Sequence, residues 1–188
     1  EPVPIRDEVL DELSNSLGIS LPTLKNYLWY AEKTFIIERV SPFFRNARNE
    51  ISKTPGVYFS DQGLRNHDLG IFGRLSRPED LGFLFQNLVF LVLREKLQRG
   101  SGEVHYWRSK SGAEIDFVLD FGRETIPVEV KYRDFQQPVV PRAFGGFIEK
   151  YHPEKCFVIN KNLNAKIEFK GSQVLFLTIW DLLEEKIV

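Results

Sequence analysis

The sequence has few of the residues that indicate several common classes of protein. It contains no methionine, one cysteine (Cys156), and three histidines without the spacing of a zinc site. A single cysteine excludes an internal disulfide, so we expect a buried core thiol in a protein of the reducing cytoplasm. The longest apolar run, 88–93, is much shorter than the roughly 20 residues of a membrane helix. We therefore expect no membrane contact.

Strong charge of one sign is also absent. The net charge of −1 excludes a generally basic, nucleic-acid-coating protein, so any DNA-binding surface must be local. No G-x-x-x-x-G-K-[ST] phosphate loop occurs, which excludes this kind of ATP site from the chain. Because the first residue is Glu1, we expect either a processed N-terminus or a fragment of a larger protein.

The N-terminal part has the pattern of a small winged-helix domain over residues 1–60. Apolar spacing predicts helices over 7–17 and 21–33, with Ser20 as the N-cap of the second helix. Strands are predicted over 34–40 and 56–59. Residues 61–78 are rich in Gly, Asn and Asp, and we expect a junction there.

In a winged helix the second helix can enter the major groove of DNA while the wing contacts the backbone. Lys25 and Asn26 lie on the outer face of that predicted helix, and the loop that forms the wing is mildly basic. A protein-connector role without DNA contact fits the same pattern. The candidate DNA-binding residues here are Lys25, Asn26, Arg45, Arg48 and Lys53.

The C-terminal part, residues 79–188, is predicted to be an α/β domain with a mixed sheet flanked by helices. A buried helix is expected over 79–98, and Gln86 lies on its apolar stripe, where a polar side chain needs a partner inside. The remaining elements are predicted in the order strands 103–108, 114–120 and 124–131, helix 140–151, strands 155–160, 167–169 and 174–177, and helix 180–186.

Four charged side chains fall on two strands of this domain. A turn at Gly122-Arg123 would place Asp116 opposite Glu129 and Glu114 opposite Lys131. Three carboxylates and one ammonium would then lie within about one cross-strand spacing, roughly 5 Å. Like charges directly opposite each other are destabilising, and a divalent cation would remove that cost. A cross-strand ion pair on a solvated face is the simpler alternative.

An Asp, a hairpin and a Glu-x-Lys after a helix resemble the PD-(D/E)XK (restriction-endonuclease-like) nuclease fold. The matching residues are Asp116 and Glu129-Val130-Lys131. The resemblance implies a Mg²⁺ site, with Mn²⁺ as a substitute, on Asp116 and Glu129. It implies that Lys131 orients the attacking water or stabilises the transition state. Arg108 is either an ion-pair partner or a phosphate contact.

A wider resemblance covers the whole chain. The predicted winged helix and the segments 56–64, 82–87, 106–108, 114–118 and 128–131 look like the C-terminal region of archaeal and bacterial AAA-type ATPases that end in a nuclease-like domain. This resemblance implies DNA and the upstream ATPase domain of the parent chain as partners. It implies ATP only for that upstream domain.

The sequence departs from the nuclease pattern at one position. The first-helix residue that is commonly Glu in that fold is Gln86, which has a carbonyl oxygen but no charge. Glu114 is the candidate replacement ligand, because it lies two residues from Asp116 on the same strand face. Three hypotheses stay open: a metal-dependent DNA endonuclease or a weakened or inactive descendant, a non-catalytic module that docks DNA or protein, and an interaction domain without a nucleic-acid role.

Overall fold

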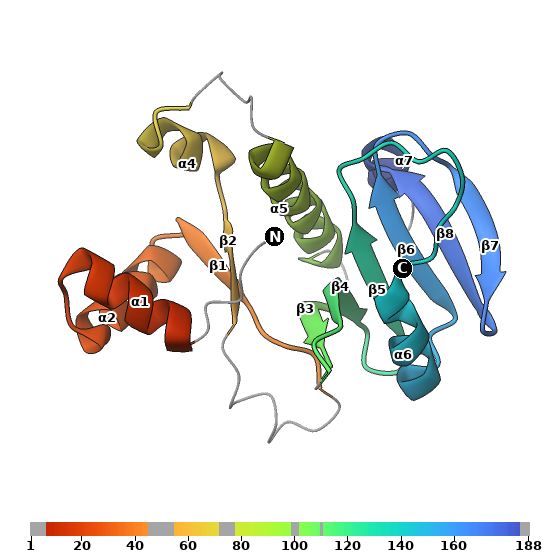
Figure 1. The fold of residues 1–188 in the computed structure, drawn as a ribbon, viewed down its shortest axis with the longest axis horizontal. Helices are drawn as coiled ribbons and strands as arrows, with labels where there is room; N and C mark the ends of the chain where they lie inside the picture. Colours follow the sequence, from red (N-terminus) through yellow and green to blue (C-terminus); the bar gives the residue numbers. More distant parts are fainter. Residues whose placement is uncertain (1–6, 45–54, 72–77, 99–101, 110, 185–188) are drawn as a thin grey trace. The chain divides into compact units, whose positions relative to one another are not determined.

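The computed structural model describes residues 7–44, 55–71, 78–98, 102–109 and 111–184 (Figure 1). Contacts between residues divide the chain into two compact units, Glu1–Phe83 and Leu84–Val188. The division falls inside helix α5 (Pro78–Gln98). The domain limits expected from the sequence, 1–60, 61–78 and 79–188, stay predictions.

The first unit contains two helices followed by a two-stranded ribbon. Ser20 begins the second helix, because its Oγ accepts a hydrogen bond from the Thr23 backbone N at 3.3 Å, as predicted for an N-cap. The two strands are antiparallel and pair Ile37 with Phe59. The elements are α1 (Asp7–Leu17), α2 (Leu21–Lys33), β1 (Ile37–Val40), β2 (Gly56–Phe59) and α4 (Gln62–Asp68).

The strand predicted over 34–40 begins three residues later than expected, and the end of α2 explains the difference. The backbone N and Oγ1 of Thr34 both donate to the Tyr30 carbonyl, at 2.9 and 2.8 Å. Phe35 then has a φ of 58°, which bulky residues rarely adopt. These two residues therefore close the helix, and extended backbone starts only at Ile37.

The second unit is an α/β structure with a mixed six-stranded sheet flanked by helices, as predicted. The strand order is β3-β4-β5-β6-β8-β7, with β5, β6 and β8 parallel and the other neighbours antiparallel. The elements after α5 are β3 (Glu103–Arg108), β4 (Glu114–Asp120), β5 (Thr125–Val130), α6 (Arg142–Tyr151), β6 (Lys155–Asn160), β7 (Ala165–Phe169), β8 (Ser172–Thr178) and α7 (Ile179–Glu184).

The hairpin of β4 and β5 has the predicted register. Asp120 pairs with Thr125, and the turn is closed by a hydrogen bond from Phe121 N to Glu124 O at 2.9 Å. Gly122 has a φ of 80° at the first central position, where a side chain would be strained. The turn therefore sets which residues of the two strands lie opposite each other.

Aromatic side chains fill the core around this hairpin. The rings of Phe90 in α5 and Phe117 in β4 stack with centroids 6.1 Å apart. Trp107 of β3 meets Phe147 of α6 edge-to-face at 5.4 Å. Cys156 is fully buried, and burial raises the pKa of its thiol to about 12, which confirms the predicted core thiol.

Helix α6 begins at Arg142 rather than at the predicted residue 140. Val140 precedes Pro141, and the proline ring disfavours helical backbone at the residue before it. Residues 131–141 therefore form a long connection from β5 to α6 at one end of the sheet. Within the described ranges, no helix is long and apolar enough to cross a membrane.

Candidate functional site

Asp116 is held in place by two hydrogen bonds at the end of the β4–β5 ladder. Its Oδ2 accepts from the Val130 backbone N at 2.7 Å, and its Oδ1 accepts from Gln86 Nε2 at 3.0 Å. The last pair of the ladder joins Phe117 to Val128, and the same register continued by one residue places Asp116 opposite Glu129. The hairpin and α5 thus fix one carboxylate beside a second.

Gln86 has the internal partner that its position on the apolar stripe of α5 predicted. The residue is 6% exposed, and its amide nitrogen donates to Asp116. In this arrangement Gln86 orients the Asp116 carboxylate. Its role as a metal ligand, predicted from the sequence, stays a prediction.

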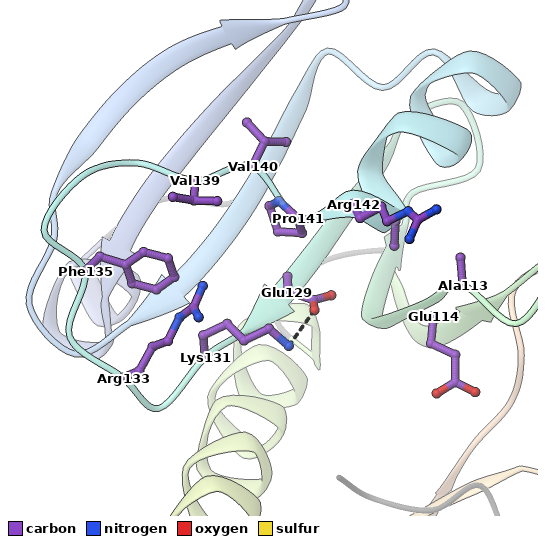
Figure 2. Close-up of a pocket in the computed structure, with 11 residues that line it drawn as sticks. Ala113, Glu114, Glu129, Lys131, Arg133, Phe135, Val139, Val140, Pro141 and Arg142 are labelled. Atoms are coloured by element: carbon purple, nitrogen blue, oxygen red, sulfur yellow. Dashed lines mark ion pairs between the residues drawn. The ribbon is translucent and has the colours of Figure 1, made fainter.

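Glu129 and Lys131 form an ion pair at the end of β5. Lys131 Nζ lies 2.7 Å from Glu129 Oε1, and the Glu129 side chain is 9% exposed against 38% for Lys131 (Figure 2). The two side chains share a strand face because they are two residues apart. The nearly buried Glu129 carboxylate is therefore paired with a partly exposed Lys131 ammonium.

Glu114 pairs with Arg108, not with Lys131 as the simplest cross-strand model predicted. Arg108 Nε lies 2.8 Å from Glu114 Oε1. Figure 2 shows the Glu114 carboxylate directed away from Glu129. Of the two roles predicted for Arg108, ion-pair partner and phosphate contact, this ion pair fits the first.

The expected repulsion between the carboxylates is thus offset by protein groups. Asp116 accepts hydrogen bonds from the Val130 backbone amide and the Gln86 side-chain amide. Glu129 forms an ion pair with Lys131, and Glu114 forms one with Arg108. A divalent cation must therefore compete with these donors, which lowers the affinity expected for it.

A pocket of about 490 Å³ opens beside Glu129 and Lys131 (Figure 2). Its walls come from the start of β4, the end of β5, the β5–α6 connection and the first turn of α6. The apolar part of the lining is Ala113, Phe135, Val139, Val140, Pro141 and Ala143, and the charged part is Glu114, Glu129, Lys131, Arg133 and Arg142. The volume is in the range of small-ligand sites.

Sequence reasoning missed Arg133 and Arg142. Arg133 continues the alternation of Glu129 and Lys131 beyond the end of the strand, which was a usable signal. Arg142 reaches the pocket only because the connection after β5 returns to the sheet. That return depends on tertiary contacts, so the sequence offered no signal for it.

The donor set fits a weak magnesium site. Mg²⁺ in proteins typically binds one or two carboxylates and retains several waters, and Asp116 and Glu129 are two adjacent carboxylates. In residues 7–44, 55–71, 78–98, 102–109 and 111–184, no three His, Cys, Asp or Glu side chains converge as a metal-binding group. A metal here would therefore rest on two carboxylates, with backbone carbonyls and water completing its shell.

The DNA-binding residues predicted for the first unit are only partly described. Lys25 and Asn26 are exposed on α2, as a groove-facing surface requires. Arg45, Arg48 and Lys53 lie outside the described residues. DNA contact by this unit stays a prediction.

The fold and the site together define an α/β domain with a mixed sheet and a charged pocket at the end of its central hairpin. Residues 81–180, more than half of the chain, match the family described as "Domain of unknown function (DUF4143)". The chain therefore belongs to the DUF4143 family, which is found in the C-terminal regions associated with AAA-type ATPases. Residues 8–75 match a second family, described as "Domain of unknown function (DUF8612)".

Two curated relatives come from mycobacteria. Uncharacterized protein Rv2008c of Mycobacterium tuberculosis and Uncharacterized protein Mb2031c of Mycobacterium bovis are each 28% identical to this chain over 122 residues. The match covers 64% of this chain and 27% of each relative. The chain thus corresponds to a minor part of the length of these relatives.

Proposed function

We propose that the second unit is a PD-(D/E)XK nuclease-like domain that hydrolyses phosphodiester bonds in DNA at Asp116, Glu129 and Lys131. We propose further that it is the C-terminal region of an AAA-type ATPase and that the first unit is its winged helix. The observation that supports the proposal most is the β4–β5 register, which continued by one residue puts Asp116 opposite Glu129, the ion-pair partner of Lys131.

The topology around the hairpin supports this proposal. Helix α5, the antiparallel strands β3 to β5, helix α6 and the parallel strand β6 follow the order that the resemblance to this nuclease fold implies. The polar helix residue, Gln86, contacts the motif aspartate, and the lysine of the Glu-x-Lys motif lies at the pocket. The contact between Gln86 and Asp116 and the position of Lys131 at the pocket both support the proposal.

The side chains have the chemistry that hydrolysis of a phosphodiester needs. Water attacks phosphorus and releases a proton to solvent while the ester P–O bond breaks and the leaving oxygen takes up a proton, so negative charge increases on the phosphate oxygens in the transition state. Lys131 places an ammonium at the pocket, where it donates to the attacking water or to a phosphate oxygen. Gln86 and the Val130 amide keep the Asp116 carboxylate in one orientation.

Asp116 and Glu129 would hold the Mg²⁺ or Mn²⁺ ion, with the Val130 carbonyl as a further oxygen ligand. When bound, such an ion lowers the pKa of its water and offsets negative charge on the phosphate. Because Gln86 adds no charge and Lys131 already pairs with Glu129, we expect an affinity lower than that of a site with three carboxylates.

A non-catalytic module that docks DNA or protein for the upstream ATPase is the second candidate. The protein partners of the carboxylates favour it, since Asp116, Glu129 and Glu114 each have at least one. This candidate predicts salt-dependent DNA binding or a stable protein partner without metal binding.

Cleavage of plasmid, linear, single-stranded and branched DNA with Mg²⁺ or Mn²⁺ tests the proposal. We expect cleavage by the wild-type chain and none by Asp116→Asn. Asp120→Asn is the matched control, because Asp120 lies on the same strand face four residues further on and caps the turn at Gly122.

Cleavage by the wild type and by Asp120→Asn, with none by Asp116→Asn, supports the nuclease. Cleavage that survives Asp116→Asn shows a contaminating enzyme and rejects the assigned site. No cleavage of any of these DNAs leaves the non-catalytic module as the function to pursue.

A further inference from the structure

The pocket beside Glu129 contains more positive charge than the nuclease motif accounts for. The two carboxylates of its lining are each paired, Glu129 with Lys131 and Glu114 with Arg108. Arg133 and Arg142 also line the pocket, and neither forms an ion pair with a carboxylate among the described residues. In a chain with a net charge of −1, this is a local excess of two guanidinium groups.

We infer that Arg133 and Arg142 bind a backbone phosphate of the nucleic acid next to the phosphodiester that is cleaved. The inference rests on the proposed function for the nature of the ligand, and on the pocket for its position. Both arginines are exposed, and Figure 2 shows them on either side of Glu129.

Arginine suits this ligand because its planar guanidinium presents a fork of donors to two phosphate oxygens. The first turn of α6 contains no acidic residue that would neutralise Arg142. A phosphate at this point would therefore meet donors from two directions, the β5–α6 connection and the beginning of α6.

Arg133 is presented by a connection that is anchored to the sheet. Asn162 accepts a hydrogen bond from Phe135 N at 2.9 Å and donates one to Phe135 O at 3.1 Å. Asp134 pairs with Lys161 at 2.8 Å, and the Arg133 guanidinium lies 4.3 Å from the centre of the Phe135 ring. The arginine is therefore partly ordered before a ligand arrives, which reduces the entropy lost on binding.

The rest of the pocket suits a nucleotide unit rather than a small anion alone. About 490 Å³ is more than a phosphate fills, and Val139, Val140 and Pro141 supply an apolar wall for a sugar. Nucleic-acid backbone combines these two features at each residue. We therefore assign the pocket to a phosphate and its attached sugar within a DNA strand.

The test measures binding of fluorescent single-stranded and duplex DNA by anisotropy in EDTA, where no metal-dependent cleavage occurs. The double variant Arg133→Ala/Arg142→Ala is compared with Arg123→Ala/Lys155→Ala, which removes the same charge from exposed positions at the far end of β5 and β6. We expect the first variant to bind at least about tenfold more weakly than the control.

Salt dependence gives a second readout of the same contacts. Each lost phosphate contact makes the slope of log K against log salt shallower by about 0.9 for duplex DNA and about 0.7 for single strands. Because both arginines contact the same phosphate, we expect a change of about that amount in the double variant and a smaller one in the control. Equal affinity and equal slope in the two double variants overturn the inference.

The source of the phosphate is resolved by competition. Inorganic phosphate and a mononucleotide are added at the same phosphate concentration as an unlabelled oligonucleotide. We expect only the oligonucleotide to compete strongly, and equal competition by inorganic phosphate overturns the assignment to a DNA strand.

The proposed catalysis and the phosphate pocket can fail separately. If Asp116→Asn and the wild type both fail to cleave while the loss of binding stays specific to the arginine variant, the pocket is supported and the nuclease is rejected. If cleavage depends on Asp116 but both double variants bind DNA equally, the nuclease stands and the pocket is rejected.

Discussion

Replacing Gln86 with Glu tests how the site is balanced electrostatically. The change puts the carboxylate that is common in this fold next to Asp116, where Gln86 Nε2 now donates at 3.0 Å. It removes a hydrogen bond to a charged group, worth about 1.5–3 kcal/mol. It also places two carboxylates at close range, which at about 4 Å and an effective dielectric of about 20 repel by about 4 kcal/mol.

Because Gln86 is only 6% exposed, the new carboxylate has little solvent to turn towards. Allowing for partial relaxation, we expect the free energy of unfolding in EDTA to decrease by about 3–5 kcal/mol. This is a large part of the roughly 5–15 kcal/mol that stabilises a domain. Gln86→Met is the matched control, since it removes the hydrogen bond without adding charge and should cost only the first term.

Mn²⁺ should offset part of the destabilisation by Gln86→Glu. An ion that binds only the folded state at about 100 times its dissociation constant stabilises by about 2.7 kcal/mol. We expect this gain to be larger for Gln86→Glu than for the wild type, and absent for Gln86→Met combined with Asp116→Asn. Urea unfolding with and without Mn²⁺ measures both effects. The reasoning is refuted if Gln86→Glu is as stable as the wild type in EDTA, or if Mn²⁺ stabilises neither protein.

Three further predictions concern single contacts. Lys131→Met removes the cation 2.7 Å from the nearly buried Glu129 carboxylate. We expect it to lower the free energy of unfolding by about 2–3 kcal/mol, less than for a fully buried pair because Lys131 is partly exposed. In urea unfolding, the double variant Lys131→Met/Glu129→Gln should recover most of that loss. Asp181 has a pKa below its usual value: burial opposes the shift, and hydrogen bonds from Thr178 and Asn164 outweigh it. Its contribution is therefore present above the unfolded pKa of 3.8 and lost as pH falls through the lower folded value, and a pH series on Asp181→Asn should show that loss removed. Burial raises the pKa of Cys156 to about 12, so its thiol should react with a disulfide reagent at pH 8 only after unfolding; rapid labelling of the folded chain would contradict the core position.

Local sequence patterns predicted much of the fold. The Gly122 turn predicted the β4–β5 register, because a two-residue turn leaves only one pairing of the flanking strands. Ser20 and Gln86 were predicted from position alone, and each has the kind of partner expected. These predictions succeeded because each depends on neighbours in the chain or on one helix face.

The parts that were not predicted depend on tertiary contacts. Nothing in the sequence indicated that Glu114 would form its ion pair with Arg108, and Lys131 with Glu129. The place of Arg142 at the pocket follows from a connection that Asn162 anchors through Phe135, and partners so far apart in the chain have no local pattern. The composition of the pocket was therefore visible only in the folded structure.

Calorimetric titration with Mn²⁺ is the most direct test of the central claim that Asp116 and Glu129 together form a metal-dependent site. We predict that the wild-type chain and Asp120→Asn each bind an ion, with binding lost in Asp116→Asn and in Glu129→Gln. Equal binding by Asp116→Asn and the wild type, or no binding by the wild type at millimolar Mn²⁺, would contradict the claim.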